Sequence, residues 1–163
     1  MVTQDRLKEL FEYCPITGTF TRKKGVKKAC AGVVAGTRAL NGYITISVDC
    51  RRYYAHRLAW LYMTGEMPVQ VDHADRDRSN NAWSNLRKAD NSRNGANKVV
   101  SNESKSGFKG VSFHKQNRKW RARVKVDGKE KHLGLFDDER SAAIAYDRAA
   151  RKFFGEFAVL NCG

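Results

Sequence analysis

Apolar residues near the start of the chain recur at the spacing of an α-helix. Leu7, Leu10 and Phe11 fall on one helical face, and the other positions of residues 6–13 are mostly polar or charged. Thr3 precedes this run and has a side chain suited to capping a helix. The pattern therefore predicts a short amphipathic helix over residues 6–13.

Residues 41–65 change from alternation to helical spacing. Asn41 and Gly42 form a dipeptide typical of a hairpin turn, and the apolar residues of 43–48 alternate with polar ones. This alternation predicts a half-buried strand. The stretch AHRLAWLYMT (55–64) then has the period of a helix, and Gly65 is placed to end it.

The most polar part of the chain follows at residues 69–98, VQVDHADRDRSNNAWSNLRKADNSRNGANK. A short apolar alternation ends at Asp72 and His73, an Asn-rich loop follows, and LRKAD reads as a second extended segment. The next helical turn carries Asn94 and has an acid and an asparagine able to cap its start. The order is strand, loop, strand and helix, in which Asp72, His73 and Asn94 are able to converge.

Beyond residue 106 the alternating pattern returns and predicts a second unit. Asp127 and Gly128 form a hairpin dipeptide because both positions tolerate a positive φ. The helix that follows has a flat face of small residues suited to lying on a sheet. The expected strands are 111–114, 120–126 and 131–136, and the expected helix is 141–153.

The middle strand of this unit separates its residues by charge. Its apolar members must face the helix, so Arg121, Arg123 and Lys125 share the opposite face. Residues 105–132 hold ten basic and two acidic side chains. A merely solvated face usually mixes the two signs. The one-sided charge favours contact with DNA, whose major groove admits a β-sheet element.

The whole chain is strongly basic. Its 163 residues include 31 Lys and Arg against 17 Asp and Glu, a net charge of +14. Such an excess favours a polyanionic partner, with nucleic acid ahead of a membrane surface. The segment 99–106 is rich in Ser, Asn and charge and lacks periodicity. We therefore expect domains at 1–98 and 107–163, joined by a linker at 99–106.

Membrane, secretory and zinc-protein assignments find little support. No apolar run approaches the roughly 20 residues that span a bilayer, and the start of the chain lacks the order of a secretory signal. The cysteines at 14, 30, 50 and 162 form no CxxC pair, which favours reduced thiols over a structural zinc site. We expect a cytoplasmic protein without a membrane partner or a small-molecule cofactor.

The polar stretch contains the residue types that phosphodiester hydrolysis needs, namely a base for the attacking water and ligands for a cation. His73 is suited to the base, because neutral imidazole accepts a proton near pH 7. Asp72 and Asn94 offer a carboxylate and an amide oxygen, which Mg²⁺ prefers. Asn85 is placed to fix the loop and hold the imidazole in one tautomer. Surface Asp-His pairs are also common, so both interpretations stay open.

Three other polar features have weaker assignments. His56 at the start of its predicted helix either bonds a neighbouring backbone group, which we favour, or contacts DNA or the active site. Arg51 and Arg52 lie in a predicted turn from which they could point at a ligand. The basic segment 23–28 is either a solvated surface or a phosphate contact.

The segment VDHADRDRSNNAWSNLRKADNSRN, preceded by YYAHRLAWLYMTGEMP, resembles the HNH endonucleases of the phage and homing type. Those enzymes have a ββα-metal fold, and the likeness runs from about Leu7 to Lys98. It implies that His73 is the general base, that Asp72 and Asn94 bind one divalent metal ion, Mg²⁺ or alternatively Mn²⁺, and that Asn85 is the middle Asn of the motif. Asn94 stands where the family name implies a final His. Asn97, one helical turn on, is an alternative ligand.

The C-terminal segment GFKGVSFHKQNRKWRARVKVDGKEKHLGLFDDERSAAIAYDRAARKFFGEFAVLN resembles an AP2 (ERF-type) DNA-binding domain. The likeness includes the three strands, the LGLF strand end, the AAIAYDRAA helix and the closing LN. It implies that Lys109, Arg121, Arg123, Lys125 and His132 face the major groove of DNA. His132 stands where plant members usually have Trp, and Lys109 where they have Arg, so their base preference does not transfer.

Together these features favour an α+β protein. We expect an N-terminal HNH ββα-metal domain and a C-terminal AP2-like three-stranded antiparallel sheet packed on one helix. The expected function is a metal-dependent endonuclease, phage or prophage encoded, that nicks double-stranded DNA as a monomer in a bacterial host cell. The alternative is a non-catalytic sequence-specific regulator, against which the intact candidate site argues. RNA is disfavoured, because the aromatics that would stack on bases occupy core-facing strand positions.

Overall fold

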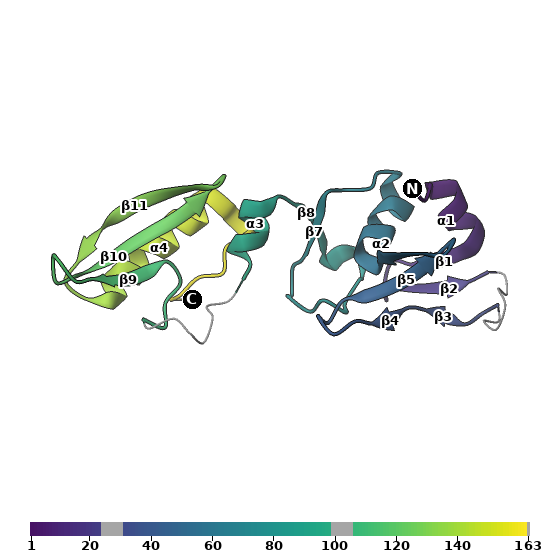
Figure 1. The fold of residues 1–163 in the computed structure, drawn as a ribbon, viewed down its shortest axis with the longest axis horizontal. Coiled ribbons are helices and arrows are strands. Elements are labelled where there is room, and N and C mark those ends of the chain that lie inside the picture. The colour runs from purple at the N-terminus through teal and green to yellow at the C-terminus, as the bar shows by residue number, and fades with distance from the viewer. Residues whose placement is uncertain (24–30, 99–105, 163) are drawn as a thin grey trace. The chain divides into compact units, whose positions relative to one another are not determined.

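Residues 1–23, 31–98 and 106–162 are described in the computed structural model, and they belong to two units, Met1–Ala89 and Asp90–Gly163 (Figure 1). Residues 24–28 of the predicted basic segment, Cys30 and nearly all of the predicted linker lie outside the described residues. The domain boundaries expected from the sequence stay a prediction. Within the described ranges no helix is both long and apolar enough to cross a membrane.

The described part of the first unit contains three small antiparallel sheets and two α-helices. One sheet has the order β1-β2-β3, another has the order β4-β5-β6, and the third pairs β7 with β8. Helix α2 packs on α1 and on strands β5, β6 and β7. The bounds are α1 (Gln4–Leu10), β1 (Phe11–Cys14), β2 (Thr19–Arg22), β3 (Val34–Ala35), β4 (Thr37–Arg38), β5 (Ile44–Val48), β6 (Arg51–Tyr54), α2 (Ala55–Thr64), β7 (Gln70–His73), the 3₁₀ helix η1 (Trp83–Asn85) and β8 (Leu86–Ala89).

The first helix is shorter than its predicted range. Thr3 caps it as expected, by accepting a hydrogen bond from the Arg6 amide, but the helix ends at Leu10. Phe11 begins strand β1 instead, so the predicted last helical turn is wrong. The cause is aromatic packing, because Phe11 and Tyr13 are buried against Phe20 of the paired strand, with ring centroids 6.3 and 4.8 Å apart.

Helix α2 closes the core of the first unit, and its predicted range is confirmed. Gly65 ends the helix in the left-handed conformation at φ +78°. Leu58 and Ala59 are fully buried and belong to one cluster with Ile46 of β5 and Val71 of β7. The strand that ends at His73 is therefore anchored by the same core that holds α2.

The second unit contains a three-stranded antiparallel sheet of order β11-β10-β9, and α4 packs on all three strands. Ala122 of the middle strand is fully buried against Ala142 and Ala143 of the helix, as the alternation predicted. Asp127 and Gly128 form the expected hairpin turn with φ values of +51° and +78°. The bounds are α3 (Asn91–Ala96), β9 (Val111–His114), β10 (Lys119–Val126), β11 (Lys129–Phe136), α4 (Glu139–Phe154) and the 3₁₀ helix η2 (Gly155–Phe157).

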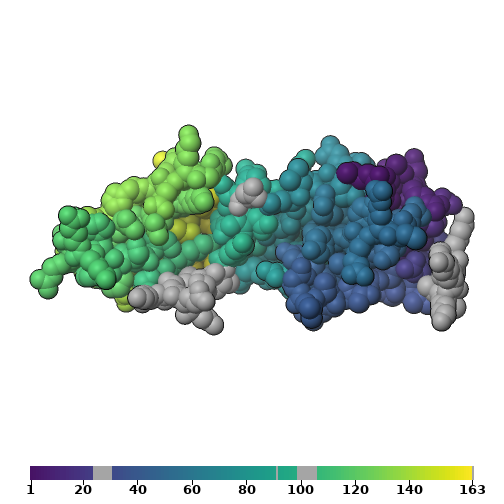
Figure 2. Space-filling model, viewed as in Figure 1, coloured from purple at the N-terminus to yellow at the C-terminus, as the bar shows by residue number. Residues whose placement is uncertain are grey.

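The sheet of the second unit has one covered and one open face. In Figures 1 and 2 the green strands lie nearer the viewer than most of α4, so the view shows the face opposite the helix. Arg121, Arg123 and Lys125 alternate with the residues that contact α4 and therefore belong to this open face.

Helix α3 follows β8 directly, which gives the predicted order of strand, loop, strand and helix. The Asp90 side chain caps it by accepting a hydrogen bond from the Arg93 amide. Within the second unit α3 contacts α4 and η2, and the Val159 amide donates to the Ala96 carbonyl at 3.2 Å. The helix is therefore docked on the C-terminal unit.

Candidate functional site

Asp72 and His73 occupy the last two positions of β7 and are only 5% and 4% exposed. They pair in register with Arg87 and Leu86 of β8. Arg87 Nη2 donates to Asp72 Oδ2 at 2.5 Å, so the candidate metal-binding carboxylate is part of a buried ion pair between the strands. The pair holds both residues at one end of the hairpin.

His73 is hydrogen bonded to the loop that joins β7 to β8. Its Nε2 lies 3.2 Å from Oδ1 of Asn81, whose Nδ2 donates to the Ser79 carbonyl at 3.0 Å. The bond to Ser79 directs the amide oxygen of Asn81 toward the ring. Nε2 must therefore carry the hydrogen, and in the neutral ring the lone pair lies on Nδ1.

The imidazole rings of His73 and His56 contact each other and two tyrosine rings. His56 packs edge-on to His73 with ring centroids 5.0 Å apart, stacks on Tyr54 at 5.4 Å and contacts Tyr43 at 5.1 Å. Burial lowers the pKa of His56 to about 3, and charge on His73 and Arg57 acts in the same direction. Burial also lowers the pKa of His73, although Asn81 and Asp75 oppose that shift. Both rings are therefore neutral near pH 7.

Asn85 holds the β7–β8 loop closed. Its Nδ2 donates to Asp75 Oδ1 and to the Asn80 carbonyl, and its Oδ1 accepts from the Asp75 amide at 3.0 Å. Asp75 Oδ2 accepts a further bond from Asn80 Nδ2 at 2.7 Å. Burial raises the pKa of Asp75, but the bonds from Asn80 and Asn85 outweigh it and lower the pKa overall. These bonds agree with the loop-fixing role predicted for Asn85, but the side chain that hydrogen bonds the His73 ring is Asn81 and not Asn85.

The turn between β1 and β2 supports the same loop from outside. Tyr13 Oη donates to the Asn81 carbonyl at 2.7 Å, and the Trp83 amide donates to the Pro15 carbonyl at 2.8 Å. A Cβ atom on Gly18 would lie 2.2 Å from the Asn81 carbonyl carbon, and this glycine has φ +71°. Only glycine fits here, so the first hairpin sets the position of the residue that bonds His73.

Asn94 lies on α3 and belongs to the other unit, so its approach to Asp72 and His73 stays a prediction. Lys109 holds the C-terminal end of that helix. Its Nζ donates to the carbonyls of Gly95, Ala96 and Lys98 at 3.2, 2.5 and 2.7 Å. Burial, with a smaller effect of the Lys98 charge, lowers the pKa of Lys109 to about 8. The resemblance placed Lys109 at DNA; in this structure its ammonium binds backbone.

The other residues expected to contact DNA lie on β10 and β11. Arg123 Nη1 donates to both carboxylate oxygens of Glu130, at 3.1 and 2.9 Å, so its charge is partly neutralised. Arg121 has a buried Nε without a hydrogen-bond partner among the described residues. Lys125 and His132 are exposed. Their contacts with DNA stay predictions.

Asp72 is the candidate carboxylate ligand for a metal ion at this site. Among the described residues no group of three or more His, Cys, Asp or Glu side chains is arranged to hold a metal ion. The carboxylate of Asp72 suits a divalent cation chemically, because it is a hard oxygen donor fixed at a strand end. In this structure the positive charge of Arg87 balances the charge of that carboxylate. A divalent cation at Asp72 would replace or share that charge.

Sequence reasoning missed several residues that the structure brings to His73. In the sequence Asn81 is one of several asparagines in a polar loop, and no pattern distinguishes Asp75 from the other acid of that loop. His56 was assigned a backbone contact, whereas its ring packs on His73 and its Nδ1 is buried without a partner among the described residues. The only available signal was the richness of the loop in Asn and Asp, which does not say which side chain meets the imidazole.

Comparison with known proteins gives one family-model match and several similar proteins. A family model described as HNH endonuclease matches residues 53–96. A protein of Acanthamoeba polyphaga mimivirus described as an uncharacterized HNH endonuclease is 35% identical over 124 residues, which are 74% of this chain and 63% of that protein. Protein 3.8 of Escherichia phage T7 is 32% identical over 105 residues, 63% of this chain and 86% of that protein.

Plant proteins match a shorter part of the chain. The AP2-like ethylene-responsive transcription factor PLT2 of Arabidopsis thaliana is 48% identical over 58 residues, 34% of this chain. Those residues are 10% of the plant protein, so the chain spans a small part of that relative and less than two thirds of the mimivirus protein.

Proposed function

Because this chain belongs to the HNH endonuclease family, we propose that it is a metal-dependent endonuclease that hydrolyses phosphodiester bonds of double-stranded DNA. One candidate site per chain leads to the further proposal that a monomer nicks one strand at a time. The relative in phage T7 supports action in the cytoplasm of a bacterial host. The net charge of +14 supports a polyanionic substrate.

One observation carries this proposal, namely the neutral, oriented imidazole of His73. Burial keeps the ring unprotonated, and Asn81 fixes the hydrogen on Nε2. The Nδ1 lone pair can then take a proton from a water molecule that attacks phosphorus. The positive charge that forms on the ring is stabilised by the Asn81 oxygen and by the carboxylate of Asp75, whose charge raises the pKa of His73.

The metal ion of the family would be held by Asp72 and Asn94, with Mg²⁺ or Mn²⁺ as the proposed ions. When bound, it would supply positive charge to the pentacovalent phosphate and to the leaving oxygen. Arg87 already balances the charge of Asp72 within the hairpin, and its side chain is next to the carboxylate that the ion would use. Asn85 keeps the loop closed, so Asp75 and Asn81 stay in place during the reaction.

The second unit would raise affinity for DNA and supply target preference. Its likeness to AP2-like plant factors supports this role, as does the run of basic residues on the open face of the sheet. Arg121, Lys125 and His132 are the side chains proposed to reach DNA directly. Arg123 would first have to leave Glu130, and Lys109 would contribute by holding α3.

A supercoiled plasmid tests the proposal. Purified full-length protein with Mg²⁺ or Mn²⁺ should convert it to the open circular form before any linear form appears, and excess EDTA should stop the reaction. The order of products tests the nicking proposal, since simultaneous appearance of linear plasmid would show paired cuts. No conversion under conditions where the protein binds the plasmid would reject the endonuclease.

A non-catalytic regulator is the second candidate, favoured by the match to plant transcription factors. It makes the opposite prediction for the same assay, because it would bind DNA and leave the plasmid intact at every metal concentration. The buried His73 and its bond to Asn81 argue against it, since DNA binding by the second unit has no need of either.

A further inference from the structure

The first unit carries a basic groove that the proposed chemistry does not use. A hollow of about 600 Å³ is lined by Arg22, Arg38 and Arg52 together with the hydroxyls of Thr37, Thr45 and Ser47. A second hollow of about 360 Å³ shares Thr45 and Arg52 with the first, and it adds Tyr54 and Arg57. We call the combined surface the arginine groove and define it by Arg22, Arg38, Arg52 and Arg57.

The charge of the arginine groove is one-sided. Among the residues that the structure describes, no Asp or Glu lines either hollow. In the described ranges Arg52 and Arg57 form no ion pair with a carboxylate, and the Nε of Arg57 is buried without a hydrogen-bond partner. Guanidinium groups collected in a concave surface without acids attract anions, and they bind phosphate through paired, forked hydrogen bonds.

The start of helix α2 adds to this preference for an anion. The helix begins at Ala55, beside Tyr54 and Arg57 of the groove, and it has 10 residues. Its first turn contains no acid, and no side chain of residues 1–23, 31–98 or 106–162 caps its N-terminus. Its first amides and the positive end of its dipole are therefore available to a negatively charged group at the same place.

The arginine groove also leads to the candidate site through side-chain contacts. Tyr54 lines the groove and stacks on His56 with ring centroids 5.4 Å apart, and His56 packs on His73 at 5.0 Å. A strand that crosses the groove would therefore pass close to the imidazole that is proposed to activate water.

We infer that the arginine groove binds backbone phosphates of duplex DNA next to the phosphodiester that is cut. The inference rests on the proposed function for its substrate and deepens it by naming the residues that hold the flanking strand. Arg52 and Arg57 contact phosphate oxygens, and the hydroxyls of Thr45 and Ser47 add hydrogen bonds. The groove contributes affinity without base preference, because phosphate contacts carry no sequence information.

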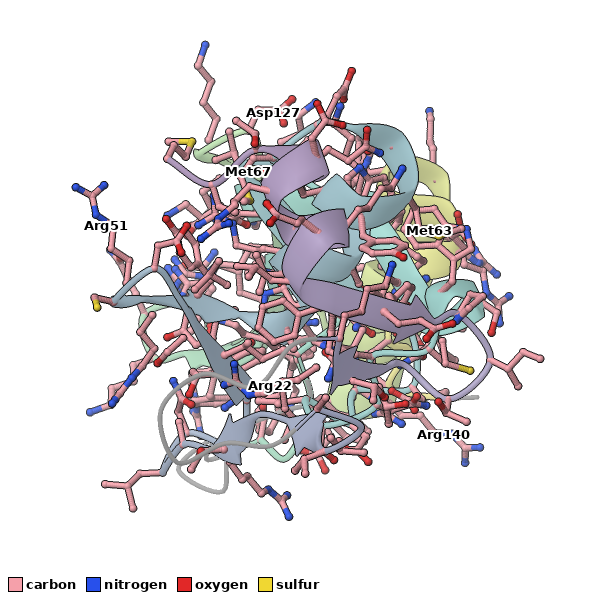
Figure 3. All side chains as sticks on the ribbon, turned by 90° about the vertical axis from the view of Figure 1, so that its right-hand side faces the viewer. Arg22, Arg51, Met63, Met67, Asp127 and Arg140 are labelled. Carbon is pink, nitrogen blue, oxygen red and sulfur yellow. The ribbon has the colours of Figure 1, made fainter. Side chains whose placement is uncertain are left out.

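The neighbouring Arg51 is the matched control. It lies beside Arg52 in β6 but lines a different hollow, together with Arg6 and Asp49. In Figure 3 its side chain extends away from the ribbon into solvent. Arg51→Ala removes the same charge from the same strand, so any difference from Arg52→Ala reports the groove and not the net charge.

The test is the salt dependence of binding to a 30-base-pair duplex, followed by fluorescence anisotropy with the full chain in EDTA. The slope of log K against log salt should flatten by about one unit for Arg52→Ala and by about two for Arg52→Ala with Arg57→Ala. Arg51→Ala should change this slope by much less than Arg52→Ala does. Arg52→Lys should retain most of the wild-type slope. Because Arg57 is partly buried, Arg52→Ala alone decides the result if the double variant unfolds.

Equal slopes for the Arg51 and Arg52 variants would overturn the inference, and so would tighter groove-dependent binding of single-stranded RNA than of the duplex. Nicking is measured separately on the same proteins. If the wild type nicks while the slopes are equal, only the groove is rejected. If the slopes differ as expected but the wild type does not nick, the proposed function fails and the groove still binds DNA.

Discussion

Nε2 of His73 lies 3.2 Å from Oδ1 of Asn81, a residue eight positions later in the loop between β7 and β8. The side-chain amide of Asn81 is itself oriented by a hydrogen bond to the Ser79 carbonyl. The backbone carbonyl of Asn81 accepts a hydrogen bond from the Tyr13 hydroxyl. The tautomer of the candidate base is therefore set by the conformation of the β7–β8 loop and not by residues of β7 itself.

Asn81→Ala removes the acceptor that keeps the hydrogen on Nε2. We expect single-turnover nicking to fall about 10- to 100-fold, the range typical when a metal-binding side chain loses the hydrogen bond that orients it. Binding to duplex DNA should stay within about twofold, because Asn81 is buried. Asn80→Ala is the control for loop closure, because Asn80 hydrogen bonds Asp75 and not His73. If Asn80→Ala slows nicking as much as Asn81→Ala does, tautomer control is wrong.

The buried histidines predict how stability changes in acid. Burial lowers the pKa of His56 to about 3, below the ordinary value of 6.5, so the unfolded state binds more protons between those pH values. The free energy of unfolding of the first unit should therefore fall as pH drops below about 6.5, with a slope of at most ~1.4 kcal/mol per pH unit from this group.

Urea unfolding measures this effect, followed by fluorescence in a Trp120→Phe background, which leaves Trp60 and Trp83 of the first unit as reporters. His56→Gln should show a shallower dependence than the parent between pH 6.5 and 4. Carboxylates also titrate in that range but are present in both proteins. Parallel curves would mean that His56 is not buried as a neutral ring.

Glycine at position 18 should be required for the candidate site. Gly18→Ala would place Cβ 2.2 Å from backbone of Asn81 at φ +71°, which forces the loop or the hairpin to move. Gly32 has φ +80° but no atom of the described residues within 4 Å of its Cβ position, so Gly32→Ala is the control for the backbone penalty, about 1–2 kcal/mol. Gly18→Ala should destabilise the protein by more and should also slow nicking. Equal effects on urea unfolding would refute the close approach.

Lys109 should stabilise α3 more than it contributes to DNA affinity. Lys109→Met removes the donor to three carbonyls at the end of that helix, so hydrogen exchange of the α3 amides should speed up at least tenfold. Lys125→Met, an exposed change in the same unit, should leave those amides unchanged. If Lys109→Met alters only the salt slope of DNA binding, Lys109 contacts DNA as the AP2 resemblance implies.

Local signals in the sequence predict much of this fold. Gly65 ends α2, Asp90 caps α3, and the Asp127–Gly128 turn joins two strands, because each depends on the conformations open to a few neighbouring residues. The prediction failed at Phe11, where helical spacing was present but burial against Phe20 decided the structure.

Some residues of the candidate site could likewise be predicted from local sequence signals, and others could not. Asp72 and His73 were predictable, because an alternating strand ends at them. The partners Asn81 and Arg87 were not, since they depend on how the loop closes and on the register of β8. The Lys109 contact with α3 is tertiary as well, and a likeness to DNA-binding domains gives no information about it.

His73→Ala decides whether this imidazole activates water. Plasmid nicking by wild type and variant is compared at saturating protein with Mg²⁺ or Mn²⁺, and duplex binding is measured in parallel in EDTA. We expect a loss of at least about 100-fold in nicking with binding nearly unchanged. Nicking at the wild-type rate by His73→Ala, or an equal loss of nicking and binding, would contradict it.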